Sequence, residues 1–504
     1  MSAGVAARVA ACGAAPGARP LRAAAGTSGR RAPAPAAAAS MDAAGAGRAL
    51  GRATSALGRR CAGGVGRVRG ALREAAVLAQ LAVTLAGHLA AAPGKRWVFM
   101  ALRLAIFSLL LLPGFVQVAF WYLFSRDVRR GVRYSPHPRN SADVYLPRRV
   151  AARGGRGGAP PPPAPAVVFV TGGAWIIGHR AWGALLGRTL SSLGLVVACL
   201  DYRNFPQGSV LDMVEDVEAG LEWVLSNVHL YGGDPRKVHV VGQSAGAHLV
   251  ALTLLRRAAA ANGRAEELGG LGGARKDCAR IGWEPGDLRT FIGLSGGYHL
   301  PVVAEHLHRR GLYKPLFDAI MSGGRLEEFS PALLVSRKPF LADGLADRRS
   351  RGALETTPRS PSPRLCWEDI GASPSRGDSS WTPPGARGTP APVASPSPSV
   401  QCLPRVLLLH GTADKSMPCS QSLEFAEALR QAGALVEVTL YSGETHTTPL
   451  IENPMRGGVD QLTQDIWRVL AGEGGEAELP PALPRPRGLV PESLASLATF
   501  VSPF

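Results

Sequence analysis

One serine of this sequence lies in a setting that could make it a nucleophile. In the stretch KVHVVGQSAGAHLV, an apolar run leads directly into Gly242-Gln243-Ser244-Ala245-Gly246, and small and apolar residues follow. This G-x-S-x-G pattern, between an expected strand and an expected helix, indicates a turn that is tight enough to require the glycines. Such a turn lifts the serine hydroxyl clear of the sheet. We expect Ser244 to be a catalytic nucleophile; the alternative is an ordinary strand–turn–helix junction.

A serine hydroxyl needs a general base, and the base needs an acidic residue that orients it. After a nucleophile of this kind, the chain order is serine, acid, histidine. The stretch VLLLHGTADKSMP places Asp414 just past one strand, and VTLYSGETHTTP places His446 just past the last one. His446 is the one histidine that follows Asp414. His410 precedes the acid, so we expect a structural role for it at the end of its strand.

Acyl transfer also needs hydrogen-bond donors aimed at the developing oxyanion. The backbone N–H of Ala245 is one candidate, because it follows the nucleophile. The turn FVTGGAW adds Gly172 and Gly173, which let the backbone approach the reacting carbonyl closely. The bulky residues around Trp175 either line an apolar pocket or pack in the core, and both interpretations stay open.

The elements that must position these residues alternate along the chain. Continuous apolar runs predict strands at 166–173, 195–203, 237–243, 290–297, 404–412 and 436–443. Helical patterns lie between and after them, at 210–227, 245–261, 421–432 and 458–470. Runs without polar alternation are typical of parallel strands that are buried on both faces. The fold class is therefore α/β, with a mostly parallel sheet flanked by helices.

A long apolar segment precedes this pattern. From Leu104 to Phe124 no residue is charged, and a helix of this length spans about 31 Å, the thickness of a bilayer core. We predict a transmembrane helix over 97–125, with the lipid bilayer as a partner. A weaker apolar stretch at 75–92 is either a second span or a surface helix. Basic residues flank the main span on both sides, so its orientation is not predicted.

The remaining segments have compositions that argue against a packed core. Residues 1–95 are rich in Ala, Gly and Arg, which indicates a disordered leader or a targeting region. Alternatively, Met41 is the true start. Within a catalytic domain at 135–472, residues 336–402 are rich in Ser, Pro, Gly and Arg, so we predict a disordered insertion without catalytic residues. Residues 473–504 form a C-terminal tail.

Overall charge and cysteine content exclude several classes of function. The net charge of +18 owes much to the leader, and no basic stretch is interleaved with aromatic residues. Nucleic-acid binding is therefore not expected. The seven cysteines are scattered without a CxxC pair, which supports neither a disulfide framework nor a metal site.

Three stretches carry a resemblance to a known family. They are VVFVTGGAWIIGHRAWGALLGRTL, VVACLDYRNFPQGSVLDMVEDV and YGGDPRKVHVVGQSAGAHL. They resemble the isoprenylcysteine methylesterases, membrane-anchored α/β-hydrolases within the hormone-sensitive-lipase-like esterase group. The resemblance covers 135–335 and 403–472 and implies an α/β-hydrolase fold. It puts the family's nucleophile, acid and base on Ser244, Asp414 and His446, and its oxyanion donors on Gly172, Gly173 and Ala245.

The resemblance also implies an activity. The enzyme would hydrolyse the C-terminal methyl ester of isoprenylated cysteine in proteins or peptides, releasing methanol and using neither a metal nor a cofactor. Its expected location is the membrane of the endoplasmic reticulum or Golgi apparatus, with one or two spans; transit to another organelle is the alternative. Two other functions stay open: a general carboxylesterase or arylformamidase for small esters or amides, and a catalytically silent binding module.

Overall fold

The computed structural model describes residues 96–147, 162–272, 282–311, 314–337, 340, 397–471 and 487–504, with a few positions between 76 and 87. The leader expected at 1–95 and the apolar stretch at 75–92 lie almost entirely outside these residues. The same holds for most of the expected insertion, 341–396, and for the first part of the tail, 472–486.

The described residues form an eight-stranded sheet with the order β1-β2-β4-β3-β5-β6-β7-β8. The strands are β1 Val128–Arg133, β2 Ser141–Tyr145, β3 Ala164–Val170, β4 Val196–Leu200, β5 Gly233–Gln243, β6 Thr290–Leu294, β7 Arg405–Gly411 and β8 Val436–Tyr441. The six strands from β3 to β8 run parallel, while β2 is antiparallel to both β1 and β4. All six predicted strands are confirmed; β1 and β2 were not predicted.

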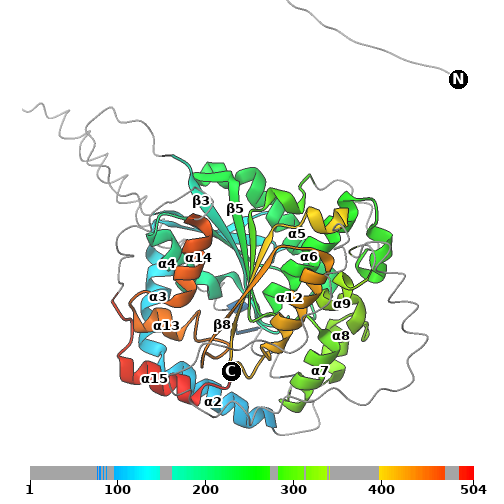
Figure 1. Ribbon diagram of the computed structural model, residues 1–504. Helices are drawn as coiled ribbons and strands as arrows, with labels where there is room; N and C mark the ends of the chain where they lie inside the picture. Colours follow the sequence, from blue (N-terminus) through cyan, green and yellow to red (C-terminus); the bar gives the residue numbers. More distant parts are fainter. Residues whose placement is uncertain are drawn as a thin grey trace, which may run out of the picture. The chain divides into compact units, whose positions relative to one another are not determined.

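Helices cover both faces of the sheet (Figure 1). One face carries α5 Val210–Asn227, α6 Ala245–Ala261 and α12 Ser420–Ala432; the other carries α4 Ala184–Ser192 and α14 Gln461–Ala471. The other described helices are α2 Arg96–Leu110, α3 Leu112–Phe124, α7 Leu300–Arg309, α8 Lys314–Ile320, α9 Pro331–Val335, α11 Pro398–Gln401, α13 Glu452–Arg456 and α15 Glu492–Val501. The predicted α/β architecture is confirmed.

Strand β3 is buried on both faces, which is why the sequence of such a strand is an unbroken apolar run. Its Val168 and Val170 join the core beneath α5 and α6, while Val167 and Phe169 join the core beneath α4 and α14. Successive side chains of a strand point to opposite faces, so a strand covered by helices on both faces needs an apolar residue at every position.

The segment expected as one membrane helix is broken into α2 and α3, which meet at an angle of 67°. Pro113 lies in the first turn of α3 and has no N–H to donate to the preceding turn, which is a sufficient cause of the break. Within the described residues, no helix taken singly is long and apolar enough to cross a bilayer; the bent pair reaches that length and composition together. The segment expected as one transmembrane helix is therefore a bent helix pair, and the membrane span stays a prediction.

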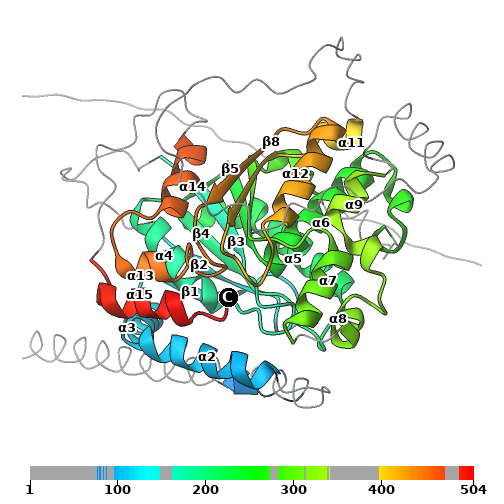
Figure 2. The ribbon, with the colours of Figure 1, turned by 60° about the horizontal axis from the view of Figure 1, so that its bottom comes forward.

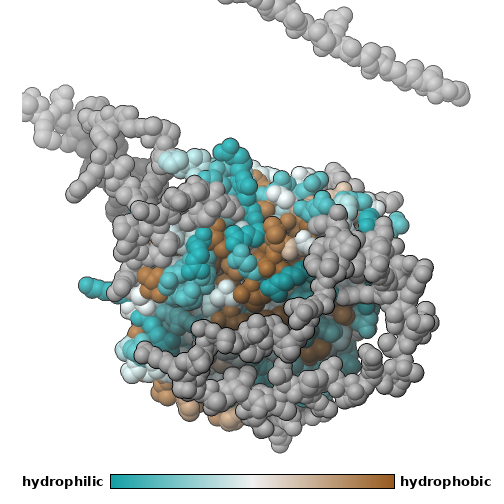
Figure 3. All heavy atoms as spheres, in the orientation of Figure 1, coloured by the Kyte–Doolittle hydropathy of each residue, from teal (hydrophilic) through white to brown (hydrophobic). Residues whose placement is uncertain are grey.

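One side of this helix pair packs on the domain and the other is exposed. Phe107, Leu111, Val118 and Tyr122 are buried in the core on the α4 side of the sheet. Ten large apolar side chains are exposed; we call them the apolar face: Val98, Phe99, Leu102, Leu104, Ile106, Leu109, Leu112, Val116, Phe120 and Phe124. Figure 3 shows a few apolar side chains at the lower left edge of the molecule, near the place where Figure 1 labels α2 and α15.

The last described residues, 487–504, form a folded part of the domain. Helix α15 lies beside α2, as Figure 2 shows, and its Ala495 and Ala498 are buried. Arg103 of α2 donates to the carbonyl oxygens of Val501 and Ser502, at 3.0 and 2.6 Å. The segment expected as a C-terminal tail therefore contains a helix that completes the packing of α2.

Candidate active site

Ser244 is the single residue between β5 and α6, and its backbone conformation is strained. Its φ and ψ angles are 53° and −120°, in a region that L-residues rarely adopt, and its N–H donates to the carbonyl of Leu294 at 2.9 Å. The glycines beside it are sterically required. A Cβ on Gly246 would lie 2.1 Å from the carbonyl oxygen of Val170, and one on Gly242 would lie 2.6 Å from Cα of Ala247. The predicted tight turn is present, with the serine at its apex.

His446 and Asp414 lie together at the same edge of the sheet. Asp414 follows β7 and His446 follows β8, so the carboxyl ends of two neighbouring parallel strands deliver them. His446 Nδ1 and Asp414 Oδ2 are 2.6 Å apart. The second oxygen, Asp414 Oδ1, accepts the backbone N–H groups of Ser416 and Met417, each at 2.8 Å. The carboxylate is thereby held in place with one oxygen directed at the imidazole.

Electrostatics keep Asp414 ionised. Burial alone would raise the pKa of Asp414, but the neighbouring His446 and the hydrogen bonds from His410 and His446 outweigh it. They hold the pKa of this carboxyl well below its usual range. A carboxylate that stays charged can stabilise an imidazolium beside it, which is the role of the acid in a serine hydrolase.

His410 has the structural role expected for it. Its ring is fully buried, with Nε2 2.8 Å from the carbonyl oxygen of Met417 and 3.3 Å from Asp414 Oδ2. Both partners are acceptors, so Nε2 carries the proton and Nδ1 accepts from the Ser422 hydroxyl at 2.8 Å. His410 therefore contacts the same carboxylate oxygen, Asp414 Oδ2, that faces His446.

The glycine turn after β3 lies against the serine. A Cβ added to Gly172 would lie 2.9 Å from Cβ of Ser244, and one added to Gly173 would lie 2.5 Å from the backbone nitrogen of Gly178. Gly173 has a φ of 128°, which favours glycine. Ala245 is the first residue of α6, so its N–H has no partner within the helix. Gly172 and Ala245 thus lie beside the predicted nucleophile, and Gly173 follows in the same turn.

A buried polar cluster holds this glycine turn in place, and its residues were not predicted to serve the site. The carbonyl of Gly178 accepts hydrogen bonds from Arg139 and, at 2.7 Å, from Asn204. The Tyr202 hydroxyl donates to the carbonyl of Thr171 at 2.9 Å. Tyr202 and Asn204 belong to the DYRN stretch after β4, so that motif anchors the turn.

Trp175 packs in the core on the α5 and α6 side of the sheet. It is 1% exposed, and its indole Nε1 donates to His248 Nδ1 at 3.2 Å. Burial lowers the pKa of His248 to about 4, so this ring is neutral, and its Nε2 donates to the carbonyl of Phe329 at 2.8 Å. Of the two roles considered for Trp175, pocket lining and core packing, the structure therefore favours core packing.

Gln243, the residue before the nucleophile, contacts two predicted site residues. Its Oε1 accepts the N–H of Gly172 at 3.1 Å, and its Nε2 lies 3.2 Å from Nε2 of His446. In the sequence, the only indication of a role for Gln243 was its position in the G-x-S-x-G pentapeptide. The two contacts join segments 71 and 203 residues apart, which no local pattern reveals.

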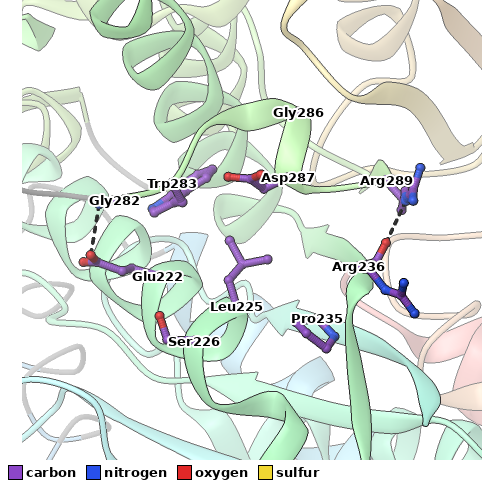
Figure 4. Close-up of a pocket in the computed structure, with 10 residues that line it drawn as sticks. All are labelled: Glu222, Leu225, Ser226, Pro235, Arg236, Gly282, Trp283, Gly286, Asp287 and Arg289. Carbon is purple, nitrogen blue, oxygen red and sulfur yellow. Dashed lines mark hydrogen bonds between the residues drawn. The ribbon is translucent and has the colours of Figure 1, made fainter. Parts of the chain in front are cut away.

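A separate cavity of about 460 Å³ lies at the opposite edge of the sheet (Figure 4). Its lining includes Glu222, Arg236, Trp283 and Arg289, which lie near the amino-terminal ends of β5 and β6. Ser244 follows the carboxyl end of β5, so this cavity is not part of the candidate active site.

The arrangement as a whole fits nucleophilic catalysis on a carbonyl. A strained serine, a histidine directed by an ionised aspartate, and a glycine turn converge at the carboxyl edge of the sheet. These are the parts that acyl transfer through a serine requires.

Two family models and several solved structures match parts of this chain. Residues 158–268, which contain the glycine turn and Ser244, match the BD-FAE family, and residues 389–463, which contain Asp414 and His446, match the prolyl oligopeptidase family. Among solved structures, a truncated carbohydrate esterase from gut microbiota is 15% identical with a TM-score of 0.43, and covers 69% of this chain and 98% of its own.

Curated relatives match over most of the chain. The probable isoprenylcysteine alpha-carbonyl methylesterase ICMEL1 of Oryza sativa subsp. japonica is 38% identical over 87% of this chain and 84% of its own length. The isoprenylcysteine alpha-carbonyl methylesterase ICME of Arabidopsis thaliana is 38% identical over 82% of this chain and 78% of its own. The chain therefore belongs to the isoprenylcysteine alpha-carbonyl methylesterase family, and it is a carboxylic ester hydrolase with an α/β-hydrolase fold.

Proposed function

We propose that this enzyme removes the methyl group from the C-terminal methyl ester of isoprenylated cysteine in proteins or peptides, with Ser244, His446 and Asp414 as its catalytic triad. The observation that carries the triad is the 2.6 Å contact between His446 Nδ1 and Asp414 Oδ2, at the edge of the sheet where Ser244 follows β5. The methylesterases to which this chain is similar support the substrate class.

The reaction follows from these positions. Ser244 Oγ attacks the carbonyl carbon of the cysteine ester while His446 Nε2 takes the hydroxyl proton. Backbone N–H groups of Gly172, Gly173 and Ala245 stabilise the oxyanion. The proton passes from His446 to the methoxy group, and methanol leaves. Water, activated by the same histidine, then hydrolyses the acyl-enzyme and restores Ser244. No step calls for a metal or a cofactor.

The first experiment compares substrates. Membranes that contain the enzyme are given a prenylcysteine methyl ester or a short-chain aryl ester, and methanol release or aryl alcohol release is measured. We expect a much higher kcat/KM for the prenylcysteine ester. The opposite preference would favour a general carboxylesterase.

The second experiment tests the nucleophile. Ser244→Ala is expected to lower methanol release by about 10⁶-fold, because without the hydroxyl no acyl-enzyme forms. Ser192→Ala, which changes an exposed serine at the end of α4, is the control and should keep full activity. Undiminished activity of the Ser244 variant would contradict the assignment.

The proposal includes attachment to a membrane, with the endoplasmic reticulum or Golgi apparatus as the location. The apolar face of α2 and α3 supports it, because ten large exposed apolar side chains on one helix pair suit a lipid surface better than water. Prenylated termini partition into bilayers, so attachment would bring enzyme and substrate together.

A charge placed on the apolar face tests the attachment. Leu109 and Phe120 are 67% and 65% exposed, and Leu109→Glu with Phe120→Glu should shift the protein from the membrane pellet to the supernatant. Leu435→Glu is a matched control, since Leu435 is 79% exposed but lies just before β8. Equal sedimentation of both variants and the unmodified enzyme with liposomes would exclude this face as the attachment site.

A further inference from the structure

Gln243 stands where three segments of the candidate site meet. It is the last residue of β5 and precedes Ser244. Its half-buried side chain reaches Gly172 of the turn after β3 on one side and His446 of the loop after β8 on the other. We call the two contacts of this carboxamide the Gln243 bridge.

The donors and acceptors of the Gln243 bridge show which ring nitrogen of His446 carries the proton. The Gly172 N–H can only donate, so the atom that faces it at 3.1 Å is the Gln243 oxygen. The Gln243 nitrogen must then face His446 Nε2 at 3.2 Å, and an amide N–H₂ can only donate. His446 Nε2 is therefore the acceptor, which leaves the imidazole proton on Nδ1, directed at Asp414 Oδ2. This is the tautomer in which Nε2 can act as a general base.

The same bridge occupies two groups that the proposed reaction needs. The Nε2 lone pair of His446 must receive the Ser244 proton, and the Gly172 N–H is one of the proposed oxyanion donors. In this structure one carboxamide bonds to both. An imidazolium has an N–H at Nε2 and cannot accept from the Gln243 amide, so the bridge exists only while His446 is neutral.

We propose that Gln243 is a positioning residue whose bridge holds His446 in its neutral, Nδ1-protonated form in the empty enzyme and is released when an ester carbonyl binds. The carbonyl oxygen takes over the Gly172 N–H and displaces Gln243 Oε1. The carboxamide then loses one of its two contacts and leaves Nε2, which is thereby freed for the Ser244 hydroxyl. Substrate binding and activation of the base are coupled through one side chain. This inference rests on the proposed triad and on Gly172 as an oxyanion donor, but not on the identity of the ester.

Two substitutions separate positioning from simple packing. Gln243→Met keeps the length of the side chain and removes both hydrogen bonds. Gln243→Glu keeps the acceptor for Gly172 and presents a carboxylate oxygen to His446 Nε2, which favours the imidazolium. Gln421→Met is the matched control, because the buried Gln421 also accepts backbone N–H groups, those of Tyr298 and His299, outside the bridge.

The first measurement is the pH dependence of the second-order rate at which a small fluorophosphonate labels Ser244. This rate depends on the base and not on recognition of a prenyl group. The acid limb of the profile should move upward by one or more pH units in Gln243→Glu, since a carboxylate near a cation favours the charged form. In Gln243→Met it should move upward by about half a pH unit, the worth of one neutral hydrogen bond. Gln421→Met should leave the limb where it is.

The second measurement tests release by substrate. With a soluble ester, the pH profile of kcat/KM reports the free enzyme and that of kcat reports the bound enzyme. The shift in Gln243→Met should appear in kcat/KM and vanish in kcat, because the bridge is already open in the complex. An equal shift in both would show that the ester does not release Gln243, and would overturn the coupling.

Other outcomes are equally decisive. If both Gln243 variants melt cooperatively and label with the unmodified pH profile, the positioning role is wrong. If Gln243→Met does not fold, the pH profile of Gln243→Glu still tests the positioning role, since this variant keeps the hydrogen bond to Gly172. Failure of the proposed function looks different: the unmodified enzyme would not label at Ser244, or would label normally yet reject prenylcysteine esters.

Discussion

Asp414 contacts both His446 and His410 and the backbone of its own loop. One carboxylate oxygen accepts two backbone N–H groups, and the other faces both His446 and His410. The charge interaction with His446 and the hydrogen bonds from His410 and His446 outweigh the effect of burial and keep the pKa of the Asp414 carboxyl low. The residue therefore carries a charge next to an imidazole throughout the neutral pH range.

Replacement of Asp414 by asparagine tests this role. The amide oxygen can still accept from Ser416 and Met417, but the amide N–H₂ would face His446 Nδ1 and move the imidazole proton to Nε2. Nε2 could then no longer take the serine proton, so kcat should fall by about 10⁴-fold. Lys415→Met, at the adjacent exposed position, is the control. A kcat for Asp414→Asn within tenfold of the unmodified enzyme would refute the role.

At the scale of elements, the loop after β8 and helix α13 together position the base. His446 lies between Thr445 and Thr447, and the Thr447 hydroxyl donates to Glu452 Oε1 at 3.0 Å. Glu452 is fully buried at the start of α13, and this burial raises the pKa of Glu452 from 4.5 to about 7. The loop that carries His446 is thus hydrogen-bonded to the Glu452 carboxyl, and burial favours the neutral form of that carboxyl.

Glu452→Gln should change how stability depends on pH. Because the pKa of Glu452 is higher in the folded than in the unfolded chain, its contribution to stability is complete below pH 4.5 and is lost as the pH rises to about 7. At about 1.4 kcal/mol per pH unit, the loss amounts to a few kcal/mol. Glutamine keeps the bond from Thr447 without the charge, so thermal midpoints at pH 8 should be higher than in the unmodified enzyme and equal at pH 4.5.

The control for this prediction is Glu305→Gln, an exposed glutamate of α7. It should leave the difference between the midpoints at pH 8 and pH 4.5 unchanged. If Glu452→Gln also left that difference unchanged, the buried carboxyl would not be responsible for it.

At the scale of the whole molecule, the catalytic domain is assembled from segments on both sides of the stretch 341–396. The two described ends of that stretch meet, since the Ser397 hydroxyl donates to the carbonyl of Phe340 at 2.8 Å. Phe340 and Val400 are both buried, so each end is anchored in the domain. The chain therefore leaves and re-enters the fold at one place.

Deletion of 341–396, with a short glycine–serine link between Phe340 and Ser397, should preserve the enzyme. The residues proposed for catalysis lie outside the deleted stretch, and its ends are already adjacent. Ester hydrolysis and the thermal midpoint should match those of the full chain. A large drop of the midpoint would show that the deleted residues contribute to the fold.

The sequence by itself determined the six strands from β3 to β8, the helices α5, α6, α12 and α14, and the residues proposed for the site. Ser244, Asp414 and His446 were identified from a pentapeptide, from chain order and from their places after apolar runs, which are local signals. The strands from β3 to β8 were predictable because burial on both faces demands unbroken apolar residues. The short strands β1 and β2 carry charged residues, among them Asp143, and escaped this pattern.

Only the tertiary structure decided which residues support the site. The packing of Trp175 and the Gln243 bridge depend on contacts between segments far apart in the chain. A glutamine before a serine reads as an ordinary polar residue until the strands bring Gly172 and His446 to either side of it. Hydrogen bonds of this kind depend on the position of atoms in space, and no composition, period or spacing along the chain encodes them.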